Sequence, residues 1–473
     1  MNVILIKTLQ LLCCLSILVL LHEFGHFGFS KLFGVRVEKF YMFFNPYFHL
    51  FSTRDKWFAR LFPRIAKNET EYGIGWVPLG GYVKIAGMID ESMDTEQMKQ
   101  PAQVDEFRSQ KVWKRFLIMF GGVLMNLITA LVIYSAVMFT WGRDFLPMQN
   151  VEQGFQFNEH AQSLGFENGD IPIAADGKTI SEWNAGNVFR MLSKAETVTV
   201  LRDGREVEIQ LTEKLNMLHI IQENPPFLTF YAPAIIDSVL PGSAMERVGG
   251  KAGDRLLAVD GKEISTWTDF DDIVLRRSDV LAMPDCSASD SLRLRSMDIV
   301  LASADGTRCD TLTLQLDEHY MMGIMRQYPT KFYDVVHEDY NILSCIPAGL
   351  RRAWSTLKGY VSDLRYVATA DGAKSVGSFI TIGNIFPSAW DWQQFWMLTA
   401  FLSIVLAVMN ILPIPGLDGG HIVLLFYEGL TGHQPSDRAM EWIERIGLFI
   451  LIALMLLAFS NDIRNFVLPL FGL

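Results

Sequence analysis

The segment LVLLHEFGHFGFSKLFG, Leu18 to Gly34, clusters His22, Glu23 and His26 inside a run of mostly apolar residues. The apolar pattern extends from Val3 to Phe33, which is long enough to cross a bilayer as a helix. Ionisable side chains at such a depth cost about 3 kcal/mol or more each, and they are usually functional. The segment therefore predicts a membrane helix that carries part of a functional site.

His22, Glu23 and His26 form the pattern HExxH, whose spacing suits a metal ion. Residues i and i+4 lie one above the other on a helix, so both imidazoles can reach one Zn²⁺, and Glu23 beside them can accept a proton from water. The pattern also occurs by chance, and the histidines are then core residues with ordinary hydrogen-bond partners. A membrane helix has no surrounding water to satisfy them, which favours zinc.

A catalytic zinc site needs a third protein ligand and one position open to water. The segment NILPIPGLDGG, Asn410 to Gly420, offers Asp418 as its single carboxylate. Its two prolines end a helix and its glycines let the backbone turn, so a non-helical segment at membrane depth is possible where it lines a water-filled cavity. The other interpretation is a proline- and glycine-rich loop between two spans that binds nothing. The presence of HExxH in the same chain favours the ligand-bearing segment over this loop.

The chain has 473 residues, of which 50% are hydrophobic, so it can hold several membrane spans and several domains. Its net charge of -11 is spread along the chain without a basic stripe, which argues against nucleic acid as a partner. Four segments reach or approach the roughly 20 apolar residues that cross a bilayer. We predict transmembrane helices at residues 1–34, 112–141, 395–425, which includes the LDGG segment, and 442–464.

The membrane topology follows from the distribution of charge. The N-terminal helix is expected to be retained, because no small-residue cleavage site follows its apolar run. Residues 35–111 carry many Lys and Arg residues near the membrane ends, so the positive-inside rule places them in the cytoplasm. The large region at about 142–394 is then expected on the outside.

This outer region contains an internal repeat. LGFENGDIPIAADGKTISEW, Leu164 to Trp183, aligns without a gap with VGGKAGDRLLAVDGKEISTW, Val248 to Trp267. In each copy Gly-Asp and Asp-Gly turns bracket a short apolar strand, as in a small β-rich domain. The second copy resembles PDZ domains, so tandem modules are expected at residues 150–220 and 225–325. Pro172 is expected to interrupt the strand of the first copy.

Two further features of the outer region remain open. An insertion at about Ser278 to Thr311 lengthens the second module and could cap its peptide groove, and Cys286 and Cys309 within it could pair in an oxidising compartment. Residues 334–394 connect the modules to the third span. The first part of this connector, 334–368, has near-helical spacing and is either an amphipathic helix on the outer membrane surface or a solvated connector.

HEFGH in the first span, the tandem PDZ-like modules and NILPIPGLDGG after the third span together resemble the site-2 intramembrane metalloproteases, in the regulator of sigma-E protease branch of Gram-negative bacteria. The resemblance covers nearly the whole chain. It implies that His22, His26 and Asp418 bind zinc, and that Glu23 is the general base. It also implies an inner-membrane location with the PDZ domains in the periplasm.

The same resemblance implies residues that contact the substrate. Asn410 is expected to hold the substrate or the transition state. Asn126 in FGGVLMNLITA lies four residues after Gly122 and matches the family's GxxxN pattern. The alternative for this segment is a small-residue helix contact with one polar residue facing the bundle.

Gly80 and Gly81 lie in GIGWVPLGGYVKIAGM, Gly73 to Met88, where apolar and small residues alternate. The pattern predicts a β-hairpin. By resemblance it is membrane-associated and pairs with an unwound substrate through main-chain hydrogen bonds, and the alternative is a purely structural hairpin.

The sequence thus predicts a polytopic α-helical membrane protein with four transmembrane helices and tandem periplasmic β-rich PDZ domains. Its predicted activity is zinc-dependent hydrolysis of peptide bonds in or near the transmembrane helix of single-pass proteins. By resemblance, these partners are an anti-sigma factor already trimmed by another protease and remnant signal peptides, all within the lipid bilayer. The rival hypothesis is a non-catalytic membrane scaffold whose PDZ pair binds periplasmic peptides, which would need neither HExxH nor Asp418.

Overall fold

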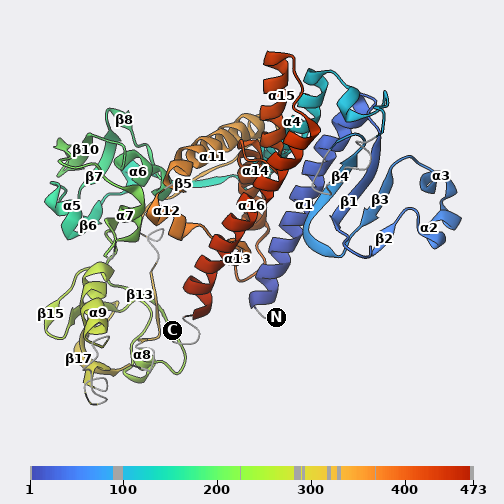
Figure 1. Cartoon of the computed structure of the whole chain (residues 1–473). Helices are drawn as coiled ribbons and strands as arrows, with labels where there is room; N and C mark the ends of the chain where they lie inside the picture. The colour runs from blue at the N-terminus through green and yellow to red at the C-terminus, as the bar shows by residue number, and fades with distance from the viewer. Residues whose placement is uncertain are drawn as a thin grey trace. The chain divides into compact units, whose positions relative to one another are not determined.

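The computed structural model describes residues 3–88, 100–223, 225–281, 289, 293–316, 321–327, 332–367 and 369–468. The chain divides into two compact units (Figure 1). The helical unit comprises Met1–Arg143 with Asp339–Leu473, and the β-rich unit comprises Asp144–Glu338. Each unit contains hydrophobic clusters formed by its own residues, so each has its own core.

Among the described residues, four helices are long and apolar enough to cross a membrane. They are α1 (Val3–Leu32), α4 (Val112–Trp141), α14 (Trp392–Ile411) and α16 (Asp437–Asp462). Four helices long and apolar enough to cross a membrane are therefore confirmed in number and composition. The third ends earlier than the predicted residue 425, because the chain turns after Ile411 before α15 (Asp418–Thr431) begins.

α4 is the central helix of the helical unit and packs against α1, α11, α14 and α15. Its contact with α1 is unusually close at Gly25 and Gly121, since a Cβ on Gly25 would lie 2.2 Å from the carbonyl oxygen of Gly121. The interface between α4 and α14 contains alanine and β-branched side chains together with the buried Tyr134. These contacts bring the HExxH turn of α1 against α4.

The connector contains helices α11 (Cys345–Val367), α12 (Ala370–Ser375) and α13 (Phe379–Ile385). One face of α11 packs on α4 and α14, and Gly349 on this face lies against Ser135. Trp354, in contrast, is 64% exposed. The first part of the connector therefore forms a helix that packs along one face, while its exposed face also carries apolar side chains. Its position on the outer membrane surface stays a prediction.

Residues 37–85 form a four-stranded sheet in the order β2-β3-β1-β4 (Figure 1). The strands are β1 (Val37–Phe44), β2 (Phe51–Ser52), β3 (Glu71–Ile74) and β4 (Val77–Ile85), and the helices α2 (Lys56–Leu61) and α3 (Pro63–Ala66) lie between β2 and β3 in the chain. β1 and β4 pack against α1. Among the described strands β4 pairs only with β1, so it is an edge strand.

The hairpin predicted from Gly73 to Met88 is wrong. β1 lies between β3 and β4, parallel to β3 and antiparallel to β4. The two residues that join β3 to β4 donate their N–H groups to β1 carbonyls, from Gly75 to Met42 at 2.8 Å and from Trp76 to Phe44 at 3.1 Å. A Cβ on Gly75 would lie 2.2 Å from the Phe44 carbonyl oxygen. The link therefore crosses the end of β1, where only glycine fits, and does not fold back on β3.

The β-rich unit holds two modules with the same sheet topology, β11-β10-β7-β8 in the first and β17-β16-β14-β15 in the second. The elements of the first are β6 (Phe155–Phe157), α5 (Glu159–Ser163), β7 (Ile171–Ala175), β8 (Lys178–Thr179), α6 (Ala185–Leu192), β10 (Thr197–Arg202) and β11 (Arg205–Gln210). Those of the second are β13 (Ile236–Val239), α8 (Ala244–Arg247), β14 (Arg255–Val259), β15 (Lys262–Glu263), α9 (Trp267–Leu281), β16 (Ser296–Ala302) and β17 (Cys309–Gln315).

Additional short elements complete the unit. They are β5 (Arg143–Pro147), η3 (Met148–Asn150), β9 (Glu182–Trp183), α7 (Met217–Gln222), β12 (Leu228–Phe230), β18 (Ile324–Arg326) and β19 (Val336–Glu338). β12 pairs with β6 in the first module, and β18 pairs with β13 in the second. The two modules thus receive an equivalent additional strand.

The internal repeat is confirmed down to single hydrogen bonds. Asp170 and Asp254 are both buried, and each carboxylate accepts the N–H of the residue three positions earlier, at 2.8 Å and 2.9 Å. Asp176 and Asp260 both have a positive φ, 45° and 49°, in the turn that follows the strand. The aspartates shared by the two sequence copies therefore have the same structural roles.

Pro172 does not interrupt its strand. β7 pairs with β10 on both sides of a register shift, which leaves Ile173 as a bulged residue. The second module has the same shift, at Leu257, in a strand that contains no proline. The bulge belongs to the module, and Pro172 is tolerated because bulges do not need every ladder hydrogen bond.

The insertion predicted at about Ser278 to Thr311 is too long. β16 and the first residues of β17 lie within it, and β16 pairs with both β14 and β17 inside the sheet of the second module. The part that lengthens the module therefore ends before Ser296. Cys309 is exposed at the start of β17, while Cys286 lies outside the described residues, so their disulfide stays a prediction.

The Asp170 carboxylate should be a main source of stability in the first module. It is fully buried and accepts two hydrogen bonds from the Arg202 guanidinium, both at 2.8 Å. We expect Asp170→Ala to lower the free energy of unfolding of this module by about 2 kcal/mol or more, because a partly buried cation loses its partner. Hydrogen exchange of residues 144–338 in the full-length protein would measure this loss.

Glu167→Ala is the matched control, because Glu167 contacts the same guanidinium from a side chain that is 66% exposed. We expect it to change the stability by less than about 1 kcal/mol. Equal protection of the module in wild type and Asp170→Ala would contradict the role assigned to the buried pair.

Candidate metal centre

The HExxH residues lie on an uninterrupted turn of α1. His22 and His26 are buried, with 9% and 6% of their surface exposed, and their Nε2 atoms are 3.3 Å apart. Both imidazoles thus present the same nitrogen to the same point, as the i and i+4 spacing predicts. Glu23 lies between them in the chain and lines the cavity that opens beside them.

Asp418 reaches this point from the opposite end of the chain. It is the first residue of α15, and its Oδ2 lies 3.3 Å from the Nε2 of His22 and 3.3 Å from the Nε2 of His26. The turn before α15 is tight, since a Cβ on Gly419 would lie 2.1 Å from the carbonyl oxygen of Leu412. The prolines and glycines of the NILPIPGLDGG segment therefore place the carboxylate opposite the imidazoles.

The spacing of these three ligand atoms fits zinc. Donors at 2.0–2.1 Å from a tetrahedral ion lie about 3.3 Å from one another, which equals each of the three distances in the structure. Oδ2 of Asp418 is also buried without a hydrogen-bond partner. A buried carboxylate oxygen needs such a partner or a cation. Among the described residues no other group of His, Cys, Asp and Glu side chains has its ligand atoms so close.

Hydrogen bonds at the other ring nitrogen prepare His26 for a metal. Its Nδ1 lies 2.9 Å from the carbonyl oxygen of Ile118 on α4. A carbonyl can only accept, so Nδ1 carries the proton and Nε2 keeps the lone pair that binds a metal.

Asn126 on α4 fulfils the same need for His22. The Asn126 amide lies 3.2 Å from the Nδ1 of His22, and its Oδ1 is buried without a donor. If the amide oxygen faces the ring, it accepts the proton of Nδ1 and the Nε2 of His22 is left for a metal. Asn126 is fully buried and is not among the cavity-lining residues. The structure therefore places it beside His22 and outside the cavity wall, and the substrate-binding role predicted for it stays a prediction.

Gly122 of the GxxxN pattern makes room for the imidazoles. A Cβ at this position would lie 2.4 Å from the Nε2 of His26 and 2.5 Å from the Cε1 of His22. These distances are shorter than any normal contact, so the two rings could not keep their positions. Gly122 and Asn126 thus support the centre from α4, four residues apart on one face.

A cavity of about 1020 Å³ opens at the centre. Its walls include His22, Glu23, His26 and Asp418, with Asn410 at the end of α14 and Gly80 and Gly81 on β4. The amide of Asn410 lies 3.4 Å from the Nε2 of His22. The structure thus brings together all the predicted site residues except Asn126 around one space.

β4 forms one wall of this cavity. Gly80 and Gly81 let its backbone run close to its neighbours, because a Cβ on Gly81 would lie 2.8 Å from the Tyr41 carbonyl oxygen and 3.1 Å from Val19. Val83 on the same strand lines the cavity together with Glu23. The edge strand therefore borders the same space as the HExxH residues.

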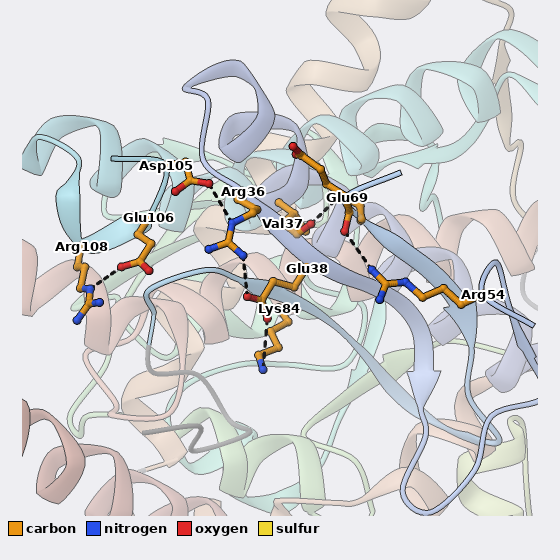
Figure 2. Close-up of polar contacts among 10 residues, drawn as sticks. Arg36, Val37, Glu38, Arg54, Glu69, Lys84, Asp105, Glu106 and Arg108 are labelled. Carbon is orange, nitrogen blue, oxygen red and sulfur yellow. Dashed lines mark hydrogen bonds and ion pairs between the residues drawn. The ribbon is translucent and has the colours of Figure 1, made fainter. Parts of the chain in front are cut away.

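Charged residues that the sequence interpretation did not single out lie at the ends of β1 and β4 (Figure 2). Glu38 contacts Arg36 at 3.3 Å and Lys84 at 3.4 Å, and Arg36 also contacts Asp105 at 2.9 Å. Lys39 and Lys84 line the cavity. These charges were visible in the sequence of the two strands, but nothing in it indicated that both strands border the metal centre.

His421 is a further residue that the sequence interpretation passed over. It lines the cavity and follows Asp418 by three positions, which is one turn of α15. The i and i+3 spacing was the available signal, because it places both side chains on the same side of a helix.

Comparison with known proteins agrees with this geometry. The model of peptidase family M50 matches residues 10–454. The chain belongs to this family. The predicted enzyme class and the resemblance to site-2 proteases are thereby confirmed, because the match spans both the HExxH helix and the LDGG segment.

Members of the M50 family from several bacteria match over almost their full length. The regulator of sigma-E protease RseP of Escherichia coli is 26% identical over 95% of this chain and 96% of that protein. Protease RseP of Yersinia pestis is also 26% identical, over 95% and 96%. A protein of Ralstonia nicotianae whose name describes it as a zinc metalloprotease is 25% identical over 97% and 98%.

The close fit of Gly122 generates a prediction about metal binding. We expect Gly122→Ala to weaken zinc binding about 10- to 100-fold, since the added methyl group displaces both imidazoles while removing no ligand. Gly28→Ala is the matched control, because a Cβ on this glycine of α1 meets nothing within 4 Å. Zinc titration of both purified variants would test this. Equal zinc affinity of Gly122→Ala and wild type would show that the rings do not need this space.

Proposed function

We propose that this M50 peptidase is a zinc-dependent intramembrane endopeptidase that cleaves within or near the transmembrane segments of single-pass membrane proteins. The observation that carries the proposal is the convergence of His22, His26 and Asp418 at equal spacing on a cavity that Glu23 also lines. Two of these residues come from a helix long and apolar enough to cross a membrane. The reaction would therefore take place at membrane depth.

The side chains around the cavity divide the chemistry between them. His22, His26 and Asp418 would hold a zinc ion, which would act as a Lewis acid and lower the pKa of a water molecule. Glu23 accepts a proton from the attacking water and returns it to the leaving amine. Asn410 directs its amide towards the same space, where it can donate a hydrogen bond to the oxygen that gains negative charge.

β4 offers a binding surface for the substrate backbone. It is an edge strand among the described strands, and its residues Gly80 to Ile85 line the cavity. An extended segment added to this edge would form main-chain hydrogen bonds whatever its side chains. Peptide bonds inside a helix are protected by their own hydrogen bonds, so addition to β4 would also favour the unwound form that hydrolysis requires.

The proposed substrates follow the family resemblance. They are an anti-sigma factor that another protease has already trimmed and remnants of signal peptides. The name of the Escherichia coli relative, regulator of sigma-E protease RseP, links that protein to sigma-E. The two modules of the β-rich unit are proposed to be periplasmic PDZ domains that select these substrates, because the second repeat resembles PDZ domains and both modules share one sheet topology. The one group of convergent ligand atoms found among the described residues lies outside them. The enzyme would lie in the inner membrane as a four-span protein.

The alternative proposal, a PDZ scaffold without catalytic activity, accounts for the two modules but not for the metal centre. It does not explain why the Oδ2 of Asp418 is buried without a hydrogen-bond partner, or why the two imidazoles converge on it. The M50 family match favours the peptidase. Zinc analysis of the purified protein separates the two alternatives, because the scaffold needs no metal.

The role of Glu23 can be tested without disturbing the ligands. We expect Glu23→Gln to lower peptide hydrolysis about 100-fold or more while the protein keeps its zinc, because the change removes the base but no donor atom. Hydrolysis of a reconstituted single-pass substrate and the zinc content would be measured on the same preparation. Near-normal turnover by zinc-loaded Glu23→Gln protein would refute the assignment.

Asp418→Ala is the companion variant, because it removes a ligand and leaves Glu23 intact. We expect it to lose zinc and activity together. If this variant kept its zinc, another side chain would have to be the third ligand.

The proposed topology gives a further test. Cysteines that replace Lys67 and Asp203 are expected to react from opposite sides of the membrane, Lys67→Cys from the cytoplasm and Asp203→Cys from the periplasm, because the basic residues of 35–111 hold that segment inside. Labelling of intact cells with a membrane-impermeant reagent would measure this. Labelling of both positions from one side would refute the four-span topology.

A further inference from the structure

An exposed apolar surface lies at the end of the sheet that is far from α1. We call it the α2–α3 surface, formed by α2, α3 and the residues that flank β2 and the β3–β4 link. Its large apolar side chains are 41–66% exposed, and they are Phe48, Leu50, Trp57, Leu61, Phe62 and Trp76. Neither short helix has a buried residue. Contiguous exposed patches of this kind mark interaction sites.

Aromatic contacts join these side chains in two groups, and the chain segments that carry the groups are hydrogen-bonded to each other, from the Leu50 N–H to the Ile74 carbonyl oxygen at 2.9 Å. Phe48 stacks on Trp76 with ring centroids 5.2 Å apart. Phe58 contacts Trp57 at 5.7 Å and Phe62 at 5.0 Å, and it packs on Phe51 of β2 at 5.2 Å. The exposed rings are therefore held by a common support, and they are not scattered surface residues.

Basic residues border the same surface. Lys56, Arg60, Arg64 and Lys67 are exposed and form no ion pair with any described residue. Residues 54–69 contain five basic and two acidic side chains, although the whole chain has a net charge of -11. One of the two acids, Asp55, already accepts hydrogen bonds from the Ser52 N–H and from His49, both at 2.9 Å. The surface thus carries an uncompensated positive charge.

The sheet connects this surface to a membrane helix. Phe27 of α1 contacts Phe40 of β1 at 5.3 Å and Tyr72 of β3 at 6.1 Å. β2 is the strand at the other edge, and Figure 1 shows α2 and α3 beyond it, away from α1. The surface therefore has a fixed position relative to a helix that crosses the bilayer, on the side where the positive-inside rule places residues 35–111.

We propose that the α2–α3 surface is a peripheral membrane anchor that binds anionic lipid headgroups of the cytoplasmic leaflet. Trp57 and Leu61, one turn apart on α2, enter the boundary between headgroups and acyl chains. Lys56 and Arg60, also one turn apart, extend to the lipid phosphates. The anchor holds the outer end of the sheet whose opposite edge, β4, lines the metal-centre cavity. It does not depend on the proposed peptidase activity.

Lipid is favoured over a protein partner by two features. The surface combines aromatic side chains with unpaired cations, which is the composition of interfacial anchors. The sheet also connects the surface to α1, a helix long and apolar enough to cross the bilayer. The surface is therefore held near the membrane before any partner in solution could bind to it.

The test places a fluorescent amino acid at position 61 of the full-length protein, in place of Leu61, by codon suppression. The protein is reconstituted in two kinds of vesicles, one of phosphatidylcholine alone and one in which about a third of the lipid is phosphatidylglycerol. Both contain lipids that are brominated near the top of the acyl chains. We expect quenching of the probe, stronger with phosphatidylglycerol. The additional quenching caused by phosphatidylglycerol should be lost in high salt, because it depends on unpaired charges. It should also be lost in the variant Lys56→Gln, Arg60→Gln, Arg64→Gln, Lys67→Gln.

Matched controls make the outcome decisive. A probe in place of Val132, 59% exposed on α4, must be quenched in every preparation, which proves correct insertion. A probe in place of the exposed Lys178 of the β-rich unit should not be quenched. The variant Lys178→Gln, Lys214→Gln, Lys251→Gln, Lys262→Gln also removes four exposed positive charges, and it should leave the phosphatidylglycerol increment at position 61 unchanged.

Three results would overturn the proposal. The first is an unquenched probe at position 61 beside a quenched probe at Val132, which would place the surface in water. The second is equal quenching with and without phosphatidylglycerol, which would exclude recognition of anionic headgroups. The third is a probe that bromine does not quench but that becomes shielded as protein density in the vesicles rises, which would show that a second copy of the chain covers the surface.

Discussion

Polar groups inside a membrane helix have no water to satisfy them, and this constraint governs the helical unit. α1 carries two imidazoles and a carboxylate into an apolar environment, and each needs a partner from elsewhere in the chain. The structure provides them for the imidazoles from α4, through the Ile118 carbonyl and the Asn126 amide, and Asp418 at the start of α15 faces the two remaining ring nitrogens. A zinc ion would complete the set, since it satisfies the two remaining imidazole nitrogens and the orphaned Oδ2 together.

Glycine residues make these partnerships possible. Gly25 and Gly121 allow α1 and α4 to approach until their backbones touch, and Gly122 leaves the space that both imidazoles occupy. Gly419 lets the carbonyl of Leu412 pass close to the first turn of α15. The distances between the ligand atoms therefore depend on residues that have no side chain to contribute. In such a centre the absence of a methyl group is as necessary as the presence of a ligand.

The sheet of residues 37–85 connects the centre to its surroundings. Its edge strand lines the cavity, its middle strands pack on Phe27 of α1, and its far edge carries the α2–α3 surface. Near the cavity, the contacts of Arg36 with Glu38 and Asp105 hold the beginning of β1 to the segment that precedes α4 (Figure 2). A substrate strand that pairs with β4 would therefore bind to an edge strand whose position is fixed by the packing of the rest of the sheet.

Features that depend on local pattern could be predicted from the sequence alone. These are the four apolar helices, the HExxH turn, the repeated modules and the choice of Asp418 as the carboxylate that meets the two histidines. Each follows from a periodicity or from a residue type that is rare in its setting, such as a lone carboxylate between prolines and glycines at membrane depth.

The tertiary structure was needed to show which segments become neighbours. The predicted hairpin was wrong because the pairing of β3 and β4 depends on β1, which comes earlier in the chain and lies between them. The inserted segment of the second module was overestimated because β16 can be recognised as a sheet strand only from its pairing with β14 and β17. Asn126 lies beside His22 and outside the cavity wall because the crossing of α1 and α4 sets its direction. Such contacts join residues far apart in sequence, so their geometry is a property of packing that no local pattern records.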